Sequence, residues 1–366
     1  MKRKILFLIG SYGTGGKERQ LTELIRGIPK DKYYLYLFMK NNSSYYFSMI
    51  KSCLRSYRCL EKSHFSLLDI LVLNNFLKEI DVDIVFSFSK TLSHYALILK
   101  LLGGFKYCLI NGSIRDAPVD FNIYMRLEKL LYNLYGEVVA NSKAGLLAYH
   151  QNEKVGRHVL YNGFDENRIP KRPKNELRYQ LGLNDKFTVV MVASMGKSKD
   201  HTTLIKAAVK VLEKNRDIQF ILIGGGPKKS EYLTLVSSLG LENDILFAGE
   251  IYNPEEYLKA SDLSVLMSTN SESFPNVVLE SLACGIPVVA NDNGGIRELM
   301  INGKNGYLIK PGDHDMLVRK ILYLYNNKKI LKQFGKNGAY RVKQNYGLSR
   351  MISSFEELID NKISLA

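Results

Sequence analysis

The feature that most constrains this fold is an alternation of short apolar runs with segments of helical spacing. In the first half, residues 5–9, 33–39, 84–88, 107–110 and 138–140 are apolar runs of strand length. Residues 18–28, 67–80 and 124–134 lie between such runs and carry apolar side chains at helical intervals. Buried strands that alternate with helices are typical of a parallel sheet with helices on both faces. The sequence therefore predicts an α/β fold.

The alternation is interrupted once, and we interpret the interruption as a domain boundary. Residues 165–185 are charged, contain Pro170 and Pro173, and have no strong strand signal before Phe187. The pattern then restarts, with predicted strands at 187–192, 220–223, 245–247, 263–267 and 287–290 and predicted helices at 202–213, 230–239 and 277–283. At roughly 150 residues per domain, a chain of 366 residues also favours two domains. We expect two Rossmann-like domains that face a cleft, residues 1–168 and 169–345, and a C-terminal helix in 346–366 that packs back on the first domain.

The chain is basic, and most of the excess charge lies in its first half. Lys and Arg total 51 against 36 Asp and Glu, a formal net charge of +15. Up to Leu183 there are 28 basic and 16 acidic residues, a net +12, which leaves +3 for the remainder. This excess indicates an anionic partner, such as a membrane surface, a nucleic acid or a phosphorylated substrate. Basic residues beside aromatic ones suit an anionic membrane interface, and the candidates are Lys2, Arg3, Lys4, Lys51, Arg55 and Arg58, with Tyr45, Tyr46, Phe47 and Tyr57.

Other features exclude several classes of protein. No apolar run reaches the ~18 residues of a membrane-spanning helix. Residues 5–9 follow a basic N-terminus but are too few for a signal peptide, so they predict a buried first strand. The four cysteines lack metal-binding spacing, which indicates free thiols in a reducing compartment. Asp81 and Asp83 precede a predicted strand and are expected at its solvated start, so we predict no metal and no other cofactor.

The first candidate site is a glycine-rich loop between a predicted strand and a predicted helix. It contains Gly10, Gly13, Gly15 and Gly16. Glycine permits close approach to the backbone and a helix N-terminus favours negative charge, so the loop suits a diphosphate or an acceptor group. It is not a dinucleotide fingerprint, because Glu18 stands where a third glycine would be needed. A turn that binds no ligand remains the alternative interpretation.

The second candidate site follows the first predicted strand of the second half. Ser194, Lys197 and Lys199 lie between that strand and the next predicted helix. Two lysines at the carboxyl end of a strand, beside the start of a helix, are placed to neutralise a pyrophosphate. The alternative is a pair of solvated charges with no ligand.

The third candidate site is a pair of glutamates, Glu272 and Glu280, eight residues apart. Pro275 suits the first turn of a helix, because the N–H that it lacks has no partner there. Glu272 would then precede the helix, Glu280 would lie inside it, and the N–H groups of Asn276 and Val277 would face an anion. Carboxylates on both sides of an anion-binding turn suit the hydroxyls of a sugar and of a ribose. A pair of surface carboxylates is the alternative.

Together these segments resemble the group 1 (family 4) glycosyltransferases of GT-B fold. Glu272 and Glu280 resemble the E-x(7)-E signature of that family, and the Ala-Cys-Gly-Ile-Pro-Val-Val-Ala of residues 283–290 extends the similarity. Further segments resemble the family in the same order along the chain: 15–18, 138–142, 161–165, 224–227, 293–298 and 305–308. The resemblance covers nearly the whole chain, and the ordered set of motifs is specific.

The resemblance implies a role for each candidate residue. Glu280 would bind the ribose of the nucleotide, Glu272 would hold hydroxyls of the donor sugar, and Lys199 would stabilise the leaving diphosphate, so that Glu272 and Lys199 are the catalytic pair. The implied donor-binding residues also include Gly16, Ser194, Lys197, Ile251, Phe274, Asn276 and Val277, and the implied acceptor-side residues are Gly15 and Arg115. Ser194 stands where the family usually has arginine, and Lys197 is the candidate replacement. The common histidine of the first domain is absent, and residues 111–115 stand in its place.

The family resemblance implies a retaining glycosyltransferase. It would move a hexose or N-acetylhexosamine from a nucleotide sugar, UDP-linked in preference to GDP-linked, to a lipid-linked saccharide in the synthesis of a bacterial capsule, O-antigen or exopolysaccharide. The protein would be cytoplasmic and peripheral at the inner face of the cell membrane. Two alternatives remain open: a sugar-nucleotide epimerase of the same fold, and a basic nucleic-acid-binding protein, for which the sequence offers no aromatic-basic recognition motif.

Overall fold

The computed structural model describes residues 2–13, 15–42, 45–62, 64, 66–118, 123–152 and 154–363. The chain forms two compact units. The first unit contains Met1–Gly163 together with Leu348–Ala366, and the second contains Phe164–Gly347. The sequence-based boundaries, 168/169 and 345/346, lie within a few residues of these.

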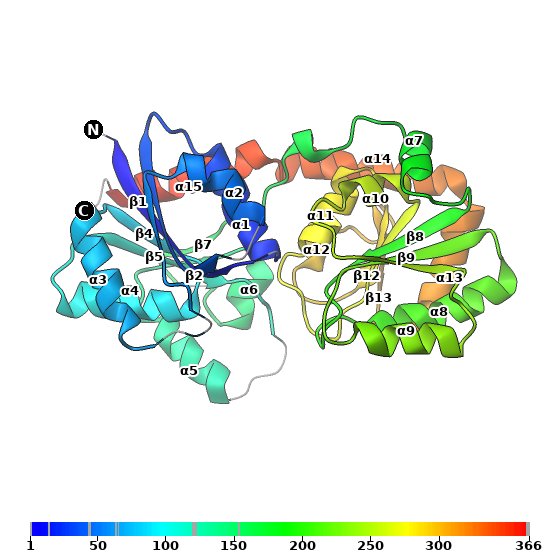
Figure 1. The fold of residues 1–366 in the computed structure, drawn as a ribbon, viewed down its shortest axis with the longest axis horizontal. Coiled ribbons are helices and arrows are strands. Elements are labelled where there is room, and N and C mark those ends of the chain that lie inside the picture. The colour runs from blue at the N-terminus through cyan, green and yellow to red at the C-terminus, as the bar shows by residue number, and fades with distance from the viewer. Residues whose placement is uncertain are drawn as a thin grey trace. The chain divides into compact units, whose positions relative to one another are not determined.

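The first unit is built on a seven-stranded parallel sheet with the strand order β3-β2-β1-β4-β5-β6-β7 (Figure 1). Its strands are β1 (Arg3–Tyr12), β2 (Tyr33–Asn42), β3 (Ser56–Cys59), β4 (Ile84–Ser87), β5 (Cys108–Ile114), β6 (Glu137–Ala140) and β7 (Arg157–Val159). Side chains of β1 alternate between the two faces: Phe7 belongs to one hydrophobic core, and Leu6 and Leu8 belong to the other. Both faces are therefore buried, as the uninterrupted apolar sequence of β1 predicts.

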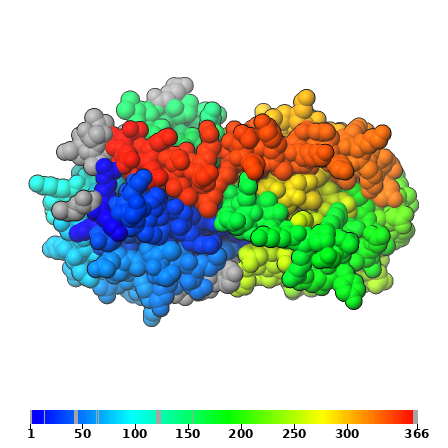
Figure 2. Space-filling model, turned by 90° about the horizontal axis from the view of Figure 1, so that it is seen from above, coloured from blue at the N-terminus to red at the C-terminus, as the bar shows by residue number. Residues whose placement is uncertain are grey.

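Each face of this sheet is covered by its own set of helices. One face packs against α1 (Gly16–Gly27), α2 (Tyr45–Ile50) and α15 (Leu348–Ile363), and the other against α3 (Asp69–Ile80), α4 (Lys90–Leu102), α5 (Ile123–Tyr132) and α6 (Lys143–Ala148). Helix α15 brings Phe355 against Phe7 and Phe86, with ring centroids 6.0 and 5.4 Å apart. Figure 2 shows these C-terminal residues (red) beside the N-terminal ones (blue). The last helix thus completes the core of the first unit.

The second unit is built on a six-stranded parallel sheet with the order β10-β9-β8-β11-β12-β13. Its strands are β8 (Phe187–Val192), β9 (Ile218–Ile223), β10 (Ile245–Gly249), β11 (Leu263–Leu266), β12 (Val288–Asn291) and β13 (Gly306–Ile309). Its helices are α7 (Lys174–Gln180), α8 (His201–Lys214), α9 (Lys229–Ser238), α10 (Glu255–Ala260), α11 (Asn276–Ala283), α12 (Ile296–Leu299), α13 (His314–Asn326) and α14 (Lys328–Asn345). Two parallel sheets with interleaved helices confirm the predicted α/β fold of two Rossmann-like units.

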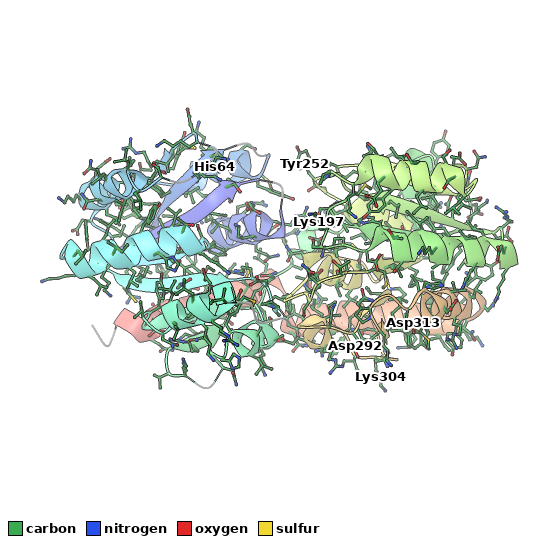
Figure 3. The ribbon with its side chains drawn as sticks, turned by 90° about the horizontal axis from the view of Figure 1, so that it is seen from below. His64, Lys197, Tyr252, Asp292, Lys304 and Asp313 are labelled. Carbon is green, nitrogen blue, oxygen red and sulfur yellow. The ribbon has the colours of Figure 1, made fainter. Side chains whose placement is uncertain are left out.

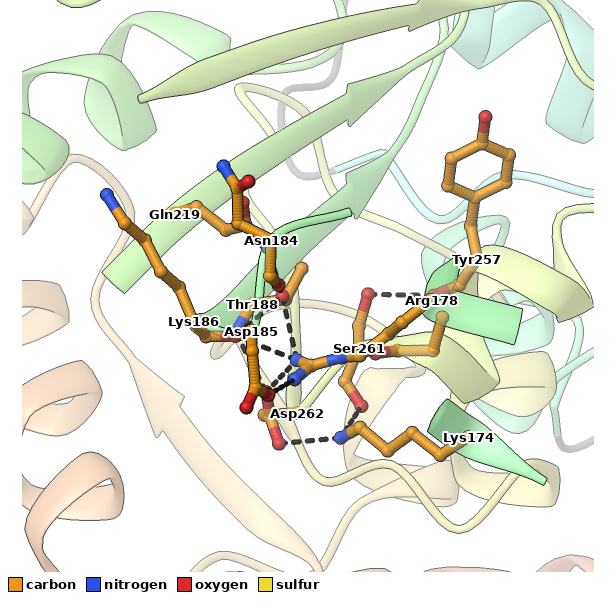
Figure 4. Close-up of polar contacts among 11 residues, drawn as sticks. Lys174, Arg178, Asn184, Asp185, Lys186, Thr188, Gln219, Tyr257, Ser261 and Asp262 are labelled. Atoms are coloured by element: carbon orange, nitrogen blue, oxygen red, sulfur yellow. Dashed lines mark hydrogen bonds and ion pairs between the residues drawn. The ribbon is translucent and has the colours of Figure 1, made fainter. Parts of the chain in front are cut away.

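A polar network anchors α7 to the amino end of this second sheet (Figure 4). Arg178 donates hydrogen bonds to Asp262 Oδ2 at 2.8 Å and to Thr188 Oγ1 at 2.9 Å. Lys174 Nζ donates to the other oxygen of Asp262 at 2.6 Å. Asp262 precedes β11, so this cluster lies at the opposite end of the strands from the candidate site and has a structural role.

The structure corrects several details of the sequence analysis. Strand β1 continues to Tyr12, so only Gly13, Thr14 and Gly15 separate it from α1, instead of a loop that begins at Gly10. The elements that sequence analysis left unassigned include β3, β7, β13, α4 and α13. Strands β3, β7 and β13 have only three or four residues, too few for a periodic signal.

The structure also corrects the interpretation of the charge. Five basic residues counted in the first half, from Arg168 to Arg178, belong to the second unit. The first unit has 25 basic and 16 acidic residues, a net +9, and the second has 26 and 20, a net +6. The charge asymmetry that pointed to the first half as a docking surface is therefore much weaker than predicted.

The predicted basic–aromatic docking surface is also altered by the fold. Tyr46 and Phe47 are buried, Tyr46 accepting a hydrogen bond from Arg19 and Phe47 packing edge-on against Tyr57. Arg3 forms an ion pair with Asp360, and Arg58 forms one with Glu79 at 3.4 Å. Two of the predicted aromatic residues therefore belong to the core, and two of the predicted cations pair with carboxylates of the same unit.

Candidate functional site

The candidate site of the second unit lies where the strand order of its sheet reverses. From β8 the sheet extends through β9 and β10 in one direction, and from β11 through β12 and β13 in the other. In open α/β sheets, ligands bind outside the carboxyl ends of the strands at this switch point. Lys199 follows β8 and Glu272 follows β11, so the two predicted catalytic residues come from the two strands that flank the reversal.

Backbone hydrogen bonds hold the segments that carry these two residues together. Asp200 N donates to Met267 O at 3.0 Å, and Thr269 N donates to Ser198 O at 3.1 Å. Lys199 Nζ forms an ion pair with Glu272 Oε1, and Ser268 Oγ donates to the same oxygen at 2.5 Å. Both side chains of the pair are mostly buried, at 18% and 17% exposure. The structure therefore brings the predicted catalytic pair into direct contact.

The backbone of Glu272 is fixed from a third strand. Gly295 N, in the loop after β12, donates to Glu272 O at 2.8 Å. Gly294 has a φ of 54°, and a Cβ at this position would lie 2.0 Å from Glu272 O. Glycine is therefore required at 294, both by its backbone conformation and by its close approach to Glu272.

The loops after β8, β9 and β10 complete this edge of the sheet. Gly224 has a φ of 137°, and a Cβ on it would lie 2.1 Å from Ala193 O, so the loop after β9 packs directly on the loop after β8. Ser194 and Lys197 are exposed, and Ile251 after β10 is half-buried. Figure 3 shows Lys197 and Tyr252 at the same end of the second unit. The structure leaves Lys197 accessible, and its role toward a phosphate stays a prediction.

The second glutamate, Glu280, lies in α11 and has a different partner. The helix begins at Asn276 after the extended Pro275, so the first N–H groups, including that of Val277, point out of its N-terminus. Phe274 is buried edge-on against Tyr346, with ring centroids 5.2 Å apart. Glu280 is buried, and its carboxylate lies 3.4 Å from Arg168, which also pairs with the buried Glu255. One guanidinium therefore holds two buried carboxylates.

Two ionisable groups beside the site are unsuited to proton transfer near neutral pH. Burial, with Glu255 and Glu280 adding to the effect, raises the pKa of the Cys284 thiol, so this cysteine stays protonated. Burial also lowers the pKa of His201 to about 4. The His201 ring stacks on Tyr232 with centroids 4.9 Å apart and is neutral at pH 7. Neither Cys284 nor His201 is therefore a candidate for proton transfer in this site.

The first unit places its predicted residues at its own switch point, between β1 and β4. Gly15 and Gly16 follow β1 and begin α1. Arg115 follows β5 and lies over the ring of Phe88, 4.4 Å from its centroid. Its Nη1 donates to Asn162 at 3.3 Å, while Nη2 has no hydrogen-bond partner within the described part of the chain. Burial lowers the pKa of Arg115 to about 9, which leaves it a cation at pH 7.

The described residues contain no group of three or more His, Cys, Asp or Glu side chains that could hold a metal ion. In the same part of the chain, no helix combines the length and the hydropathy that crossing a bilayer requires. Lys199, the carboxylates of Glu272 and Glu280, and the N-terminus of α11 suit an anionic ligand that also carries hydroxyl groups.

Sequence reasoning missed three residues that shape this site. Arg168 and Glu255 hold Glu280, and Ser268 binds Glu272. Arg168 lay in the segment interpreted as a domain boundary, and Glu255 is 25 residues from Glu280. Only for Ser268 is there a local signal, because it lies four residues before Glu272 and two residues after the buried strand β11.

Comparisons with known proteins identify similar glycosyltransferases. Residues 173–341 match the family model of the glycosyl transferases group 1. Over 359 residues the chain is 27% identical to the N-acetylgalactosamine-N,N'-diacetylbacillosaminyl-diphospho-undecaprenol 4-alpha-N-acetylgalactosaminyltransferase of Campylobacter jejuni, covering 93% of this chain and 95% of that one. It is 25% identical over 178 residues to the capsular polysaccharide biosynthesis glycosyltransferase CapM of Staphylococcus aureus, covering 47% of this chain and 46% of that one.

Solved structures show the same fold. The structure of Anabaena HepE in complex with UDP and glucose superimposes with a TM-score of 0.86 at 23% identity, covering 98% of this chain and 99% of that chain. The predicted GT-B architecture is thereby confirmed. With the family match in the second unit, these findings support one assignment: residues 173–341 form a glycosyl transferases group 1 domain, in a chain that has the GT-B fold.

Proposed function

We propose that this glycosyltransferase moves a hexose or N-acetylhexosamine from UDP to a lipid-linked saccharide, with retention of anomeric configuration. The observation that carries the proposal is the ion pair between Lys199 and Glu272 at the switch point of the second sheet. A sugar nucleotide brings both an anionic diphosphate and hydroxyl groups, and the pair offers a partner for each. We propose UDP in preference to GDP as the first nucleotide to test.

The ion pair suggests how a donor would be held. In the structure, Glu272 forms an ion pair with Lys199, and Ser268 donates a hydrogen bond to the carboxylate of Glu272. A diphosphate carries more charge than one carboxylate, so it would compete for Lys199 and release Glu272 toward the sugar hydroxyls. As the bond between sugar and phosphate breaks, negative charge grows on the diphosphate, where Lys199 and the first N–H groups of α11 stabilise it. Glu280 accepts hydrogen bonds from the ribose.

The proposed acceptor follows from the relatives. The Campylobacter enzyme is named for a diphospho-undecaprenol acceptor, and CapM for capsular polysaccharide biosynthesis. We infer an acceptor of the same class, a saccharide on a lipid diphosphate, in the synthesis of a bacterial surface polysaccharide. Such an acceptor requires a protein that works peripherally at the inner face of the membrane. No metal or other cofactor enters the proposal.

A two-step experiment tests this function. Thermal unfolding of the purified protein is first followed with UDP, GDP and their sugar derivatives, because a ligand that binds only the folded state raises the melting temperature. The Lys199→Met variant and the exposed control Lys206→Met are measured in parallel. Stabilisation of the wild type and of Lys206→Met, but not of Lys199→Met, supports the site. Transfer from the selected donor is then assayed with lipid-diphosphate saccharides, and the anomeric configuration of the product is determined by NMR. No stabilisation by any sugar nucleotide would overturn the proposal.

A further inference from the structure

Helix α5 presents apolar side chains to the outside of the first unit as well as to its core. Met125 and Tyr132 are buried in the hydrophobic core beneath the helix. Ile123, Leu127 and Leu130, together with Leu134 just past its end, are 55–85% exposed. These four residues lie at positions i, i+4, i+7 and i+11, which form a single stripe along a helix. Among the residues that the structure describes, these four side chains are not part of the core, so we treat the stripe as a candidate surface for a partner.

The neighbouring helices extend the stripe into a larger surface. Leu101 and Leu102 at the end of α4 are 71% and 85% exposed. Helices α4 and α5 are in contact, since Lys90 of α4 lies 3.8 Å from Glu128 of α5. A pocket of about 400 Å³ is lined by Leu101 and by Leu134. We call the combined surface the leucine face, and it consists of Leu101, Leu102, Ile123, Leu127, Leu130 and Leu134.

The segment before α3 lies beside the middle of α4. Tyr95 in the middle of α4 donates a hydrogen bond to Ser66 O at 3.1 Å, which brings the first residues of α3 alongside α4. Leu67 and Leu68 there are 82% and 71% exposed. Helices α3, α4 and α5 cover the same face of the first sheet, below the strands in Figure 1. The exposed apolar residues of three helices thus gather on one side of the unit.

The charges around the leucine face indicate which partner it fits. Lys100 and Arg126 are exposed on α4 and α5, and Lys106 follows α4. The one acidic residue of these two helices, Glu128, is buried and faces Lys90. An apolar stripe flanked by cations, with no exposed carboxylate on its helices, complements an anionic lipid surface. A second copy of the chain would bring the same positive charges and be repelled.

We propose that the leucine face docks this protein on an anionic bilayer, its leucines entering the headgroup region and Lys100, Lys106 and Arg126 facing lipid phosphates. The inference deepens the proposed function by naming the membrane surface that a lipid-linked acceptor requires. It replaces the docking surface predicted from the sequence, whose Tyr46 and Phe47 are buried in the core.

Vesicle co-sedimentation tests the proposal without any substrate. The full-length protein is mixed with phosphatidylcholine vesicles that contain increasing fractions of phosphatidylglycerol, at low and high salt. The test variant is L127E/L130E, and a matched control, L233E/L239E, places the same changes at exposed leucines of the second unit. A third variant, K51E/R55E/R58E, tests the basic–aromatic docking surface that was predicted from the sequence. Because all these leucines point outward, thermal unfolding should show folded proteins.

The expected result is wild-type binding that rises with phosphatidylglycerol and falls with salt. L127E/L130E should lower the partition coefficient by at least about tenfold, since each change removes an inserted leucine and adds a repelled charge. L233E/L239E should bind as the wild type does. Equal binding by L127E/L130E and wild type, or loss of binding in K51E/R55E/R58E alone, overturns the proposal.

Two further measurements separate this proposal from its alternatives. Light scattering determines the oligomeric state, and a wild-type dimer that L127E/L130E dissociates, without vesicle binding by either protein, would show self-association and overturn membrane docking. Calorimetry determines nucleotide binding, which L127E/L130E should leave unchanged. Failure of vesicle binding with intact nucleotide binding would therefore contradict only the docking surface, and the reverse result would contradict only the donor site.

Discussion

Lys199 and Glu272, which are 73 residues apart in the sequence, form an ion pair at the edge of the second sheet. Their segments follow the two adjacent strands between which the strand order reverses, and Ser268 adds a hydrogen bond to the same carboxylate oxygen. Each of the two residues is therefore partly neutralised by the other. Five predictions follow from this arrangement and from the contacts around it.

Replacing Lys199 should impair turnover as well as donor binding. Lys199→Ala removes the cation that faces the leaving diphosphate, and we expect kcat to fall at least tenfold, about 1.4 kcal/mol of transition-state stabilisation. Steady-state kinetics with the donor selected by the thermal screen measures the effect. If Lys197 replaces the missing arginine, Lys197→Ala should lose turnover to a similar extent. If Lys197→Ala has wild-type kinetics, Lys199 and the N-terminus of α11 stabilise the diphosphate without Lys197.

Replacing Glu280 should weaken nucleotide binding. Glu280→Gln keeps the size of the side chain but removes the charged acceptor for the ribose hydroxyls, and we expect a loss of about 1–3 kcal/mol, roughly 5- to 150-fold in Kd. Isothermal titration with the free nucleotide measures the affinity. Glu231→Gln changes an exposed carboxylate of the same unit and serves as the control. An unchanged Kd in Glu280→Gln would contradict the ribose assignment.

Removing Arg168 should destabilise the second unit. Its side chain is 14% exposed, and its partners Glu255 and Glu280 are buried. Arg168→Ala leaves two buried carboxylates without their shared cation, so unfolding should become easier by about 3–5 kcal/mol. The exposed pair of Arg297 and Asp292 provides the control, and Arg297→Ala should cost about 1 kcal/mol or less. Denaturant unfolding measures both variants. If they lose the same amount of unfolding free energy, the buried ion pairs stabilise the protein no more than the exposed pair does.

Gly294 and Gly303 form a matched pair for testing the support of Glu272. Both have positive φ, 54° and 71°, so alanine at either position should cost about 1–2 kcal/mol of backbone strain. Only at Gly294 would the added Cβ meet Glu272 O, at 2.0 Å. We expect Gly294→Ala to reduce kcat by at least about tenfold through displacement of Glu272, and Gly303→Ala to retain wild-type kcat. Equal kcat values in the two variants would contradict a positioning role for Gly294.

His201 should make stability depend on pH. Burial lowers its pKa to about 4 in the folded protein, whereas an unfolded histidine titrates near 6.5. Between these values the unfolded chain binds the extra proton, so the free energy of unfolding should fall as pH drops from about 6.5 to about 4, by up to about 1.4 kcal/mol per pH unit. His201→Phe keeps a ring against Tyr232 and should flatten this slope. Unfolding measured at several pH values compares the two proteins, and identical slopes would exclude His201 as the cause.

The fold of both units could be predicted because its signals are local. Apolar runs of strand length and helical spacing repeat along the chain, and residues 5–9 show by continuous hydrophobicity that both faces of β1 are buried. Ser194 and Lys199 could also be placed at the end of a strand from the sequence, and Glu272 in the loop before a helix. Their approximate neighbourhood follows once a parallel sheet is assumed, because the carboxyl ends of its strands share one edge.

The contacts within the site could not be predicted in the same way. The strand order β8–β11 decides that Lys199 meets Glu272, and nothing in either segment encodes that order. The sharing of Arg168 between Glu255 and Glu280 depends on packing between segments up to 112 residues apart. Distant pairs of this kind leave no periodic signal in the sequence.

The sequence by itself determined the class of fold, the order of the motifs and the family that they resemble, because each rests on spacing within a few residues. Only the tertiary structure decided which side of an apolar helix faces water. Helix α5 is apolar on two sides, and the core takes Met125 and Tyr132 while Leu127 and Leu130 remain outside. The same holds for the distribution of charge. The five basic residues from Arg168 to Arg178 belong to the second unit, because that segment of the chain packs there. When a helix is apolar on two sides, the side that is buried depends on the packed chain, and no pattern within the helix fixes it.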